Sequence, residues 1–600
     1  MGSGHSFENP IPNYRLICIF RFLLASLNIE AILQESTIHR RRERLSKITD
    51  GLGLEDVYGA TIERIKAQGG DKSRLGMGAL MWISYAEEPL SPDELCHALA
   101  IELGSTDFNA DNIPSITTLV GCCQGLVTVD KEESNVRLIH FTLREYFSSH
   151  PDIFSRHHSR IAEMCLTYLN SQQVKALSPN PSTNVYAVVS DQPFLRYCSL
   201  YWGAHAKMDL SDCARSLALE LLRESSVHIS AVYLLEREIE QDRFATIRLF
   251  NGLHWASLLG IVEIVAALIQ TGCYDLNGGG YRECPPLLLA ARKGHEEVVK
   301  ILLGREEVDP DKPDDIGRTP LSYAAQEGHE GVVKTLLRLE GVAPHKPDMF
   351  GRTPLSHAAE HGRVSVLEIL LEWEEVDSDK PDMFGRTPLS HAAERGRVGV
   401  LEILLEREEV YPDEPDMFDR TPLSHAAQRG WVEAVEILLE RAEIDPDKPD
   451  NRGLTPLLHA ASGVAFDGYL PEHDEVVEIL LDREEVNPDR PDNGGRTPLS
   501  RAAKDGRRGV VKILLGREEV NPDRRDNDGR TPLSYAVEEG RTEVVKILLG
   551  REEVNREKPD NIGKTPLMWA PGWRRREMVA LLQPPKPVTH NAIEDLNGTT

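Results

Sequence analysis

Apolar positions in the second half of the chain recur in a fixed order, between short polar turns and an Asp/Pro-rich loop. Eight copies of this pattern contain Thr-Pro-Leu, and two degenerate copies precede them at Asn251 and Pro285. The eight begin at Thr319, Thr353, Thr387, Thr421, Thr455, Thr497, Thr531 and Thr565. The spacing is 34 residues at every step but one, where it is 42. A period of this size predicts a solenoid in which each copy stacks on its neighbours.

Each copy predicts two short helices. In the copy that begins at Thr319, this threonine is the expected N-cap, and Pro320 takes the first helical position, where its missing N–H costs nothing. Two alanines keep the first helix thin, and Gly328 fits the left-handed residue that ends a helix. The second helix carries the apolar pairs Val332-Val333 and Leu336-Leu337, which form one buried stripe.

These residues resemble the ankyrin repeat, whose pattern runs from a turn through Thr-Pro-Leu-His, two alanines and Gly-His to Val-Val and Leu-Leu. One departure is serine in place of the histidine after leucine, at Ser322, Ser356, Ser390, Ser424, Ser500 and Ser534. The resemblance implies an all-α-dominated fold, with about ten helix-turn-helix repeats and β-turn or hairpin loops over residues 246–582. It also implies that the array binds a protein ligand, through its turn tips and its concave helix face.

The front of the chain predicts helices and a short hairpin. A helix is expected from Leu54 to Gln68, and Ser91 with Glu94 three residues later predicts a capping box at the start of another. Residues 125–129 and 136–141 alternate like two strands. Helices followed by a two-stranded wing suggest a winged-helix-like domain over residues 76–152.

The same stretch resembles the segment that follows the nucleotide-binding module in fungal NACHT–ankyrin proteins, which look like innate-immune or incompatibility receptors. Residues 89–95 and 140–147 carry this resemblance. It implies that residues 1–75 correspond to the end of a NACHT module and residues 153–245 to a helical connector. The only Gly-Lys-Thr is Gly563-Lys564-Thr565, which lies on a repeat turn and lacks the upstream glycine of a phosphate-binding loop. No nucleotide is therefore expected, and the chain looks like a receptor without its nucleotide-driven module.

Charge and composition favour a soluble protein that binds proteins. The net charge is −28, and most of the acidic excess lies in the repeats, which argues against nucleic acid as a partner. The apolar run from Leu16 to Leu33 is broken by Arg21, Asn28 and Glu30, so no membrane span is expected. Nine cysteines without a Cys-x-x-Cys pair suggest reduced thiols and a cytoplasmic protein. The tail at residues 583–600 is expected to be disordered.

No residue pattern predicts catalysis, and neither a cofactor nor a metal is expected. His357, His391, His425 and His459 occur once per repeat. Stacked helices lie about 8–10 Å apart, whereas a zinc–nitrogen bond is about 2 Å. Neighbouring histidines of this set are therefore expected to pack or to form hydrogen bonds rather than to share a metal.

The predicted turn tips supply the candidate binding residues. Three successive tips carry a Met-Phe pair, in the order Met349, Phe350, Met383, Phe384, Met417 and Phe418. Exposed apolar patches of this kind usually mark partner sites. Duplication is the competing explanation, because residues 349–382 and 383–416 differ at only six of 34 positions.

Two further features are candidates for the same surface. Arg352, Arg386 and Arg420 stand beside the tips, and they are expected either to pair from one repeat to the next with turn aspartates such as Asp348 or to contact the partner. The longer step inserts eight residues, with Phe466 and Tyr469 among those between Ser462 and Glu472. This insertion is either a tolerated loop or a contact loop.

Overall fold

A computed structural model describes residues 36–43, 54–130, 132–177, 192–223, 228–231, 233, 250–462 and 473–583. These residues are rich in helix and contain few strands, which confirms the expected helix-dominated fold class. They form two compact units. The first runs to Ala290 and also includes Glu297–Val308, and the second comprises Ala291–Glu296 and the chain from Asp309 onward.

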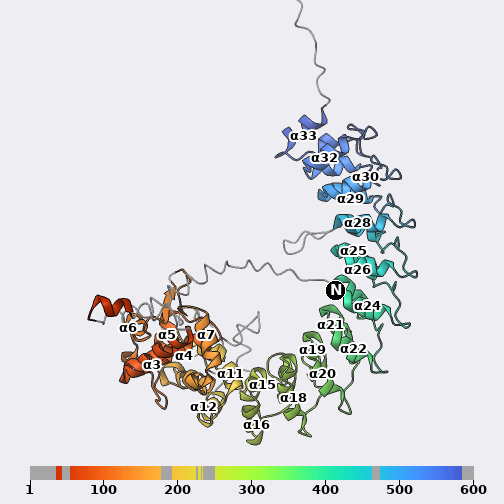
Figure 1. Ribbon diagram of the computed structural model, residues 1–600. Coiled ribbons are helices and arrows are strands. Elements are labelled where there is room, and N and C mark those ends of the chain that lie inside the picture. The colour runs from red at the N-terminus through yellow and green to blue at the C-terminus, as the bar shows by residue number, and fades with distance from the viewer. Residues whose placement is uncertain are drawn as a thin grey trace, which may run out of the picture. The chain divides into compact units, whose positions relative to one another are not determined.

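The first unit begins with short helices and one β-hairpin (Figure 1). Its elements up to the hairpin are α3 (Leu54–Ala67), α4 (Gly70–Tyr85), α5 (Pro92–Leu99), η1 (Ala110–Asn112), α6 (Ile116–Cys122), β1 (Val127–Asp130) and β2 (Asn135–Leu138). The strands pair antiparallel, with Val127 opposite Leu138. The predicted capping box at Ser91 and Glu94 is confirmed, with both reciprocal hydrogen bonds present.

Further helices follow the hairpin in the first unit. They are α7 (Thr142–Ser149), η2 (Pro151–Phe154), α8 (His157–Leu169), α9 (Gln172–Lys175), α11 (Leu195–Met208) and α12 (Asp212–Arg223). The Trp82 ring is fully buried and meets Phe194 and Tyr197 of the α11 region edge to face, at 5.4 and 5.6 Å between ring centroids. These aromatic contacts join α4 to α11 in one core.

The first degenerate repeat comprises α15 (Gly252–Leu259) and α16 (Val262–Gln270). It packs on α12. Gly252 lies so close to α12 that a Cβ there would come within 2.6 Å of the Leu222 carbonyl oxygen. This close approach explains the glycine where later copies have proline. The last elements near the boundary of this unit are η4 (Tyr281–Glu283), α17 (Pro286–Arg292) and α18 (Glu296–Leu303).

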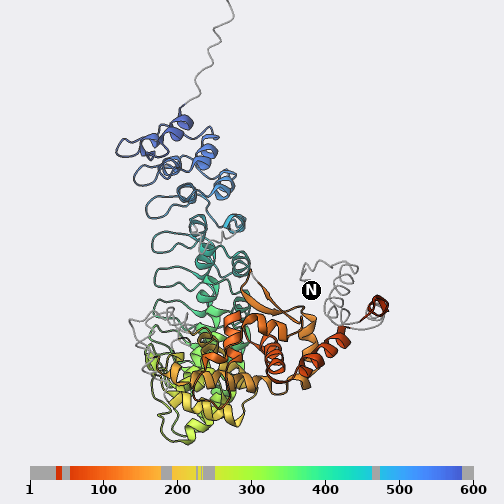
Figure 2. The same cartoon turned by 90° about the vertical axis from the view of Figure 1, so that its left-hand side faces the viewer.

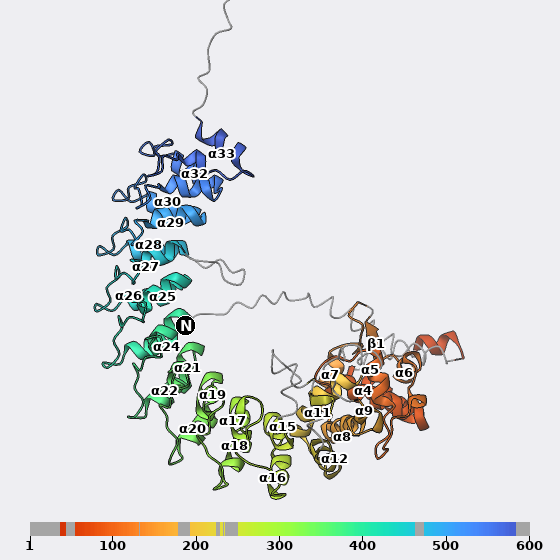
Figure 3. The ribbon, with the colours of Figure 1, turned by 180° about the vertical axis from the view of Figure 1, so that it is seen from behind.

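The second unit is a stack of helix pairs. In chain order they are α19 (Pro320–Glu327) and α20 (Glu330–Leu337), α21 (Pro354–His361) and α22 (Val364–Leu371), α23 (Pro388–Glu394) and α24 (Val398–Leu405), α25 (Pro422–Arg429) and α26 (Val432–Leu439), α27 (Pro456–Ala461) and α28 (His473–Leu481), α29 (Pro498–Asp505) and α30 (Arg508–Leu515), and α31 (Pro532–Glu538) and α32 (Thr542–Leu549). First helices pack on first helices of the next pair, and second helices on second helices. Figures 2 and 3 show the connecting loops projecting from one side of this stack.

The helix boundaries follow the predicted signals. Thr353 Oγ1 accepts a hydrogen bond from the Ser356 N–H at 3.2 Å, and Gly362 ends the helix in the left-handed conformation. The serine that replaces the family's histidine thus contributes its backbone N–H to the threonine cap. The apolar pairs of each second helix, such as Val366, Leu367, Leu370 and Leu371 in α22, are buried.

The final copy departs from the others. Its first helix is replaced by the 3-10 segment η5 (Pro566–Trp569), which is followed by α33 (Arg575–Leu582). Phe466, Tyr469 and the tail after Gln583 lie outside the described residues. The predictions for the inserted loop and for the tail therefore stay predictions, as do the proposed domain boundaries.

Candidate functional site

A buried carboxylate shapes each turn tip. Asp348 Oδ1 accepts hydrogen bonds from the N–H groups of Phe350 and Arg352, at 2.9 and 3.0 Å. Its Oδ2 accepts one from His357 Nε2 at 3.1 Å. Since the Asp348 side chain is fully buried, these three bonds fix the turn and the direction of the residues at its tip.

The four histidines predicted to pack or to form hydrogen bonds all donate a hydrogen bond to the aspartate of their own turn. His391, His425 and His459 donate to Asp382, Asp416 and Asp450 in the same way, each at 3.1 Å. Burial favours a raised pKa for these aspartates, but the histidine and backbone hydrogen bonds outweigh it and lower the pKa. Burial lowers the pKa of His357 and His425, so both act as neutral N–H donors.

Backbone hydrogen bonds join each tip to the next. The Met349 N–H donates to the Ile316 carbonyl at 2.9 Å, and the Met383 N–H donates to the Phe350 carbonyl at 2.8 Å. The Met417 N–H donates to the Phe384 carbonyl at 2.8 Å. Successive tips are therefore held in register by the main chain.

The Met-Phe pairs stand at the ends of these turns, and we call Met349, Phe350, Met383, Phe384, Met417 and Phe418 the tip row. The three methionines are 61%, 59% and 59% exposed, and Phe350 and Phe418 are 37% and 41% exposed. Phe384 is half-buried. Large apolar side chains thus reach solvent on three adjacent repeats, as expected from the sequence.

The arginines beside the tips pair with acids of this chain. Arg318 and Arg352 approach the aspartate of the following turn, at 3.6 Å from Asp348 and 3.8 Å from Asp382. Arg386 and Arg420 instead approach the aspartate of their own turn. The expected pairing between repeats is therefore found at Arg318 and Arg352, whereas Arg386 and Arg420 pair within their own turn. The Arg386 and Arg420 guanidinium groups also lie 5.4 and 5.1 Å from the rings of Phe384 and Phe418.

Two glutamates complete this charge network. Glu360 forms ion pairs with Arg352 and Arg395, each at 2.9 Å. Glu394 forms ion pairs with Arg386 at 3.0 Å and with Arg429 at 2.7 Å. Burial alone would raise the pKa of Glu394, but the bond from Arg429 and the nearby cations lower it to about 2. These ion pairs balance the charges of the arginines and connect adjacent repeats. Sequence reasoning missed these glutamates, although both stand seven residues after a Thr-Pro-Leu start, at Thr353 and at Thr387.

Comparison with known families identifies the array. The family described as ankyrin repeats (3 copies) matches residues 253–348, 331–416, 407–470 and 508–592, which together cover just over half of the chain. The chain belongs to the ankyrin-repeat family. A second family, described as GPI inositol-deacylase, winged helix domain, matches residues 63–164. No curated protein matches the chain.

A pocket of this ankyrin-repeat protein lies beside the last residue of the tip row. It has a volume of about 400 Å³ and is lined by Phe418, Arg420, Asp450, His459 and Arg501, among others. Arg501 replaces the histidine of earlier repeats and pairs with Asp492 at 2.6 Å. The pocket therefore lies between the last repeat that has a histidine at this position, His459, and the next repeat, which has Arg501 there.

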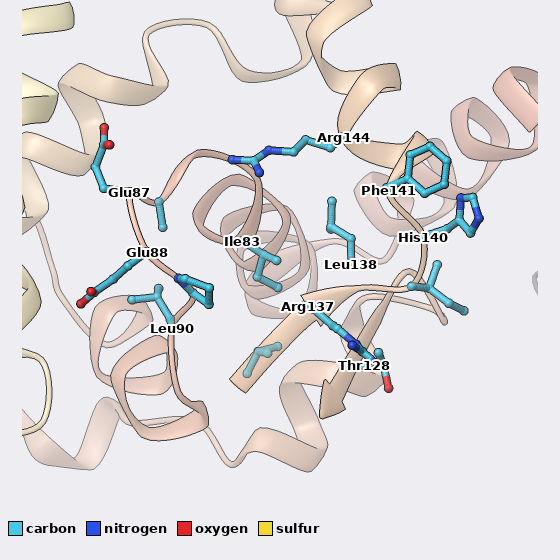
Figure 4. Close-up of a pocket in the computed structure, with 14 residues that line it drawn as sticks. Ile83, Glu87, Glu88, Leu90, Thr128, Arg137, Leu138, His140, Phe141 and Arg144 are labelled. Carbon is cyan, nitrogen blue, oxygen red and sulfur yellow. The ribbon is translucent and has the colours of Figure 1, made fainter. Parts of the chain in front are cut away.

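The winged-helix region of the ankyrin-repeat protein has a groove of its own, which Figure 4 shows. It has a volume of about 590 Å³ and runs between the end of α4 and β2. Ile83 and Leu138 supply apolar walls, and Phe141 is 65% exposed at its rim. Arg137 at the groove pairs with Asp130 at 2.7 Å.

The parts of this ankyrin-repeat protein that the structure describes contain no group of three or more His, Cys, Asp or Glu side chains that could hold a metal ion. They also contain no helix long and apolar enough to cross a bilayer.

Proposed function

We propose that the chain is a non-enzymatic recognition or scaffold protein, whose array of about ten ankyrin repeats binds a protein partner through the tip row. The observation that carries this proposal is the exposure of Met349, Met383 and Met417 on three tips that hydrogen bonds hold in register. A preordered surface binds with a smaller loss of conformational entropy than a mobile loop does.

The chemistry of the tip row suits protein recognition. Methionine is flexible and polarizable, so it adapts to a partner, while phenylalanine supplies a rigid apolar anchor. The arginines beside the tips are already paired within the chain, so they add polar rim contacts without presenting unpaired charge.

Duplication remains the competing explanation for the three Met-Phe pairs. The direct test replaces Phe350, Phe384 and Phe418 with serine in the full chain and compares the proteins captured from cell lysate. The matched control is Ile562→Ser, because Ile562 occupies the equivalent tip position and is 70% exposed. Loss of a partner in the triple variant but not in the control is expected, and an unchanged partner list would sink the proposal.

A second candidate function follows from the winged-helix match at residues 63–164. The chain would then be part of a NACHT-type immune or incompatibility receptor, whose nucleotide-binding module is supplied by another chain or is missing from the gene model. Reading the 5′ end of the transcript tests this candidate. An in-frame phosphate-binding loop upstream would support it, and a stop codon there would count against the gene-model version.

A further inference from the structure

A regular set of ion pairs connects the bases of the tip loops. The loops are variants of the pattern x-Pro-Asp-Lys-Pro-Asp, with Lys or Arg at the fourth position in most copies. At five steps the third residue of one loop pairs with the fourth residue of the next. We call this set the ion-pair ladder. Its pairs are Asp311–Lys346 at 3.5 Å, Asp413–Lys448 at 2.8 Å, Asp447–Arg490 at 2.9 Å, Asp489–Arg524 at 2.8 Å and Asp523–Lys558 at 2.8 Å.

The ion-pair ladder is interrupted at two adjacent steps, both beside the tip row. His345 takes the place of an aspartate opposite Lys380, and Glu414 takes the place of a lysine opposite Asp379. Neither Lys380 nor Glu414 forms an ion pair with any residue that the structure describes. Asp379 therefore faces a carboxylate where the other ladder aspartates face a cation.

Asp379 is poorly compensated at this position. Its Oδ2 accepts the Tyr411 N–H, at 3.1 Å, where the Oδ2 of each paired ladder aspartate meets a cation. Its Oδ1 is buried without a hydrogen-bond partner, as is the Oδ1 of the paired aspartates, so the difference lies at Oδ2. Burial raises the pKa of Asp379, the Tyr411 N–H partly opposes this, and the Glu414 and Asp377 charges raise it further, to about 6. The neighbouring Ser378 is only 3% exposed, and its hydroxyl has no hydrogen-bond partner, at a position where most other loops have proline.

Duplication does not explain the interruption at Asp379. Residues 349–382 and 383–416 are nearly identical, yet three of their six differences fall in this loop: Asp377 becomes Tyr411, Ser378 becomes Pro412, and Lys380 becomes Glu414. The Met-Phe tips were copied unchanged, whereas the residues around the missing cation diverged. The interruption is thus a feature of this copy rather than of the repeated unit.

The surroundings of Asp379 favour a basic side chain. Tyr411 is 68% exposed and its backbone N–H donates to Asp379, so an exposed aromatic residue belongs to the same loop contact as the unpaired acids. Met383 and Met417 of the tip row belong to the same two loops. A cation at this place would gain from both carboxylates and from the ring.

We propose that a lysine or arginine side chain of the protein partner occupies the empty cation position between Asp379 and Glu414, against Tyr411. This inference rests on the proposed function, because the partner's apolar residues would lie on the tip row at the same time. It specifies the partner as a segment with a basic residue flanked by apolar or aromatic ones.

The test selects dodecapeptides from a random phage-displayed library on the full chain. Enriched peptides are expected to carry Lys or Arg next to apolar residues. Glu414→Lys would place a cation opposite Asp379, as Lys448 is opposite Asp413, and is expected to weaken a selected peptide about tenfold. Glu443→Lys makes the same charge change on the next repeat, at an exposed residue, and is expected to leave binding unchanged.

A double-mutant cycle localises the contact. Replacing the peptide's basic residue with methionine is expected to weaken binding by a similar factor, and the two changes together should cost no more than either alone. The change in the peptide leaves the protein unaltered, so its result can be interpreted even if Glu414→Lys disturbs the fold. The inference would be overturned if the losses in affinity from Glu414→Lys and from the peptide change multiplied in the double variant. Equal losses for Glu414→Lys and Glu443→Lys would overturn it too, and so would enriched peptides without basic residues.

The outcomes separate this inference from the proposed function. If Phe384→Ser and Phe418→Ser abolish binding while Glu414→Lys does not, the tip row is a binding site and the cation position is not. If Glu414→Lys abolishes binding while the serine variants do not, the cation position stands and the tip row fails. If no peptide is enriched, this inference fails, and the proposed function is decided by its own capture experiment.

Discussion

Replacing Asp379 with asparagine should stabilise the array at neutral pH. An acid whose pKa rises from 3.8 to about 6 on folding corresponds to ~3 kcal/mol of destabilisation at pH 7. Asp379 is only partly buried, so solvent screening reduces this figure, and we expect a gain of about 1 kcal/mol in Asp379→Asn. Asparagine keeps an oxygen that can accept the Tyr411 N–H.

The gain should depend on pH in a defined direction. The folded-state pKa of Asp379 is raised, so its cost is fully present above pH 6 and disappears as the pH falls through 6 toward the unfolded value near 4. The advantage of Asp379→Asn is therefore expected at pH 7 and absent at pH 4.

Hydrogen exchange measured by mass spectrometry on the full chain is the appropriate assay, because repeat arrays open locally and need not unfold in one step. Peptides covering α22 to α25 should exchange about fivefold more slowly in Asp379→Asn at pH 7. The matched control is Asp413→Asn. Lys448 lies 2.8 Å from Asp413 and opposes part of the burial effect that raises the pKa of Asp413, so this variant should gain less than Asp379→Asn does. Equal gains in both variants, or the same gain at pH 4 and pH 7, would refute the reasoning.

Three further predictions concern the turns and caps of the same repeats. Asp419 has a φ of 62° where Gly385 and Gly453 occupy the equivalent position, so Asp419→Gly should raise the free energy of local opening around α25 by about 1 kcal/mol, measured by the same hydrogen exchange. Thr421→Ala removes the acceptor of the Ser424 N–H and should lower the free energy of opening of α25 by about 1 kcal/mol in the same measurement, and no loss would contradict the capping role. Burial lowers the pKa of His425, so its contribution to stability is present above pH 6.5 and is lost as the pH falls. His425→Tyr, which copies the Tyr535 hydroxyl bond to Asp526, should therefore show a smaller drop in melting temperature between pH 7 and pH 5 than the parent chain does.

The repeated part of the fold was predictable because its signals are local. Thr353, Pro354 and Gly362 specify where a helix begins and ends, and each acts within a few residues along the chain. The role of His357 was predicted only as packing or hydrogen bonding, since its aspartate partner stands nine residues earlier on another element. The exposure of Met349 and Phe350 followed from their place in a polar turn.

The ion-pair ladder was not predicted, because each pair joins residues about one repeat apart. Lys448 and Asp413 are 35 positions apart, and which side chains meet across repeats depends on how the helices stack. Once that register is known, Glu414 stands out as a reversed charge within a repeated loop. The physical information that sequence reasoning lacked was therefore the alignment between neighbouring copies.

The backbone hydrogen bonds between tips have a consequence for variation and engineering. Each bond uses one N–H and one carbonyl, which every residue except proline supplies identically. The spacing of the tips therefore does not depend on which side chains they carry. Residues such as Met383 and Phe384 can be exchanged for other types while the array keeps its geometry. A library randomised at these positions, with proline excluded at the donor residue, would sample new specificities on an unchanged frame.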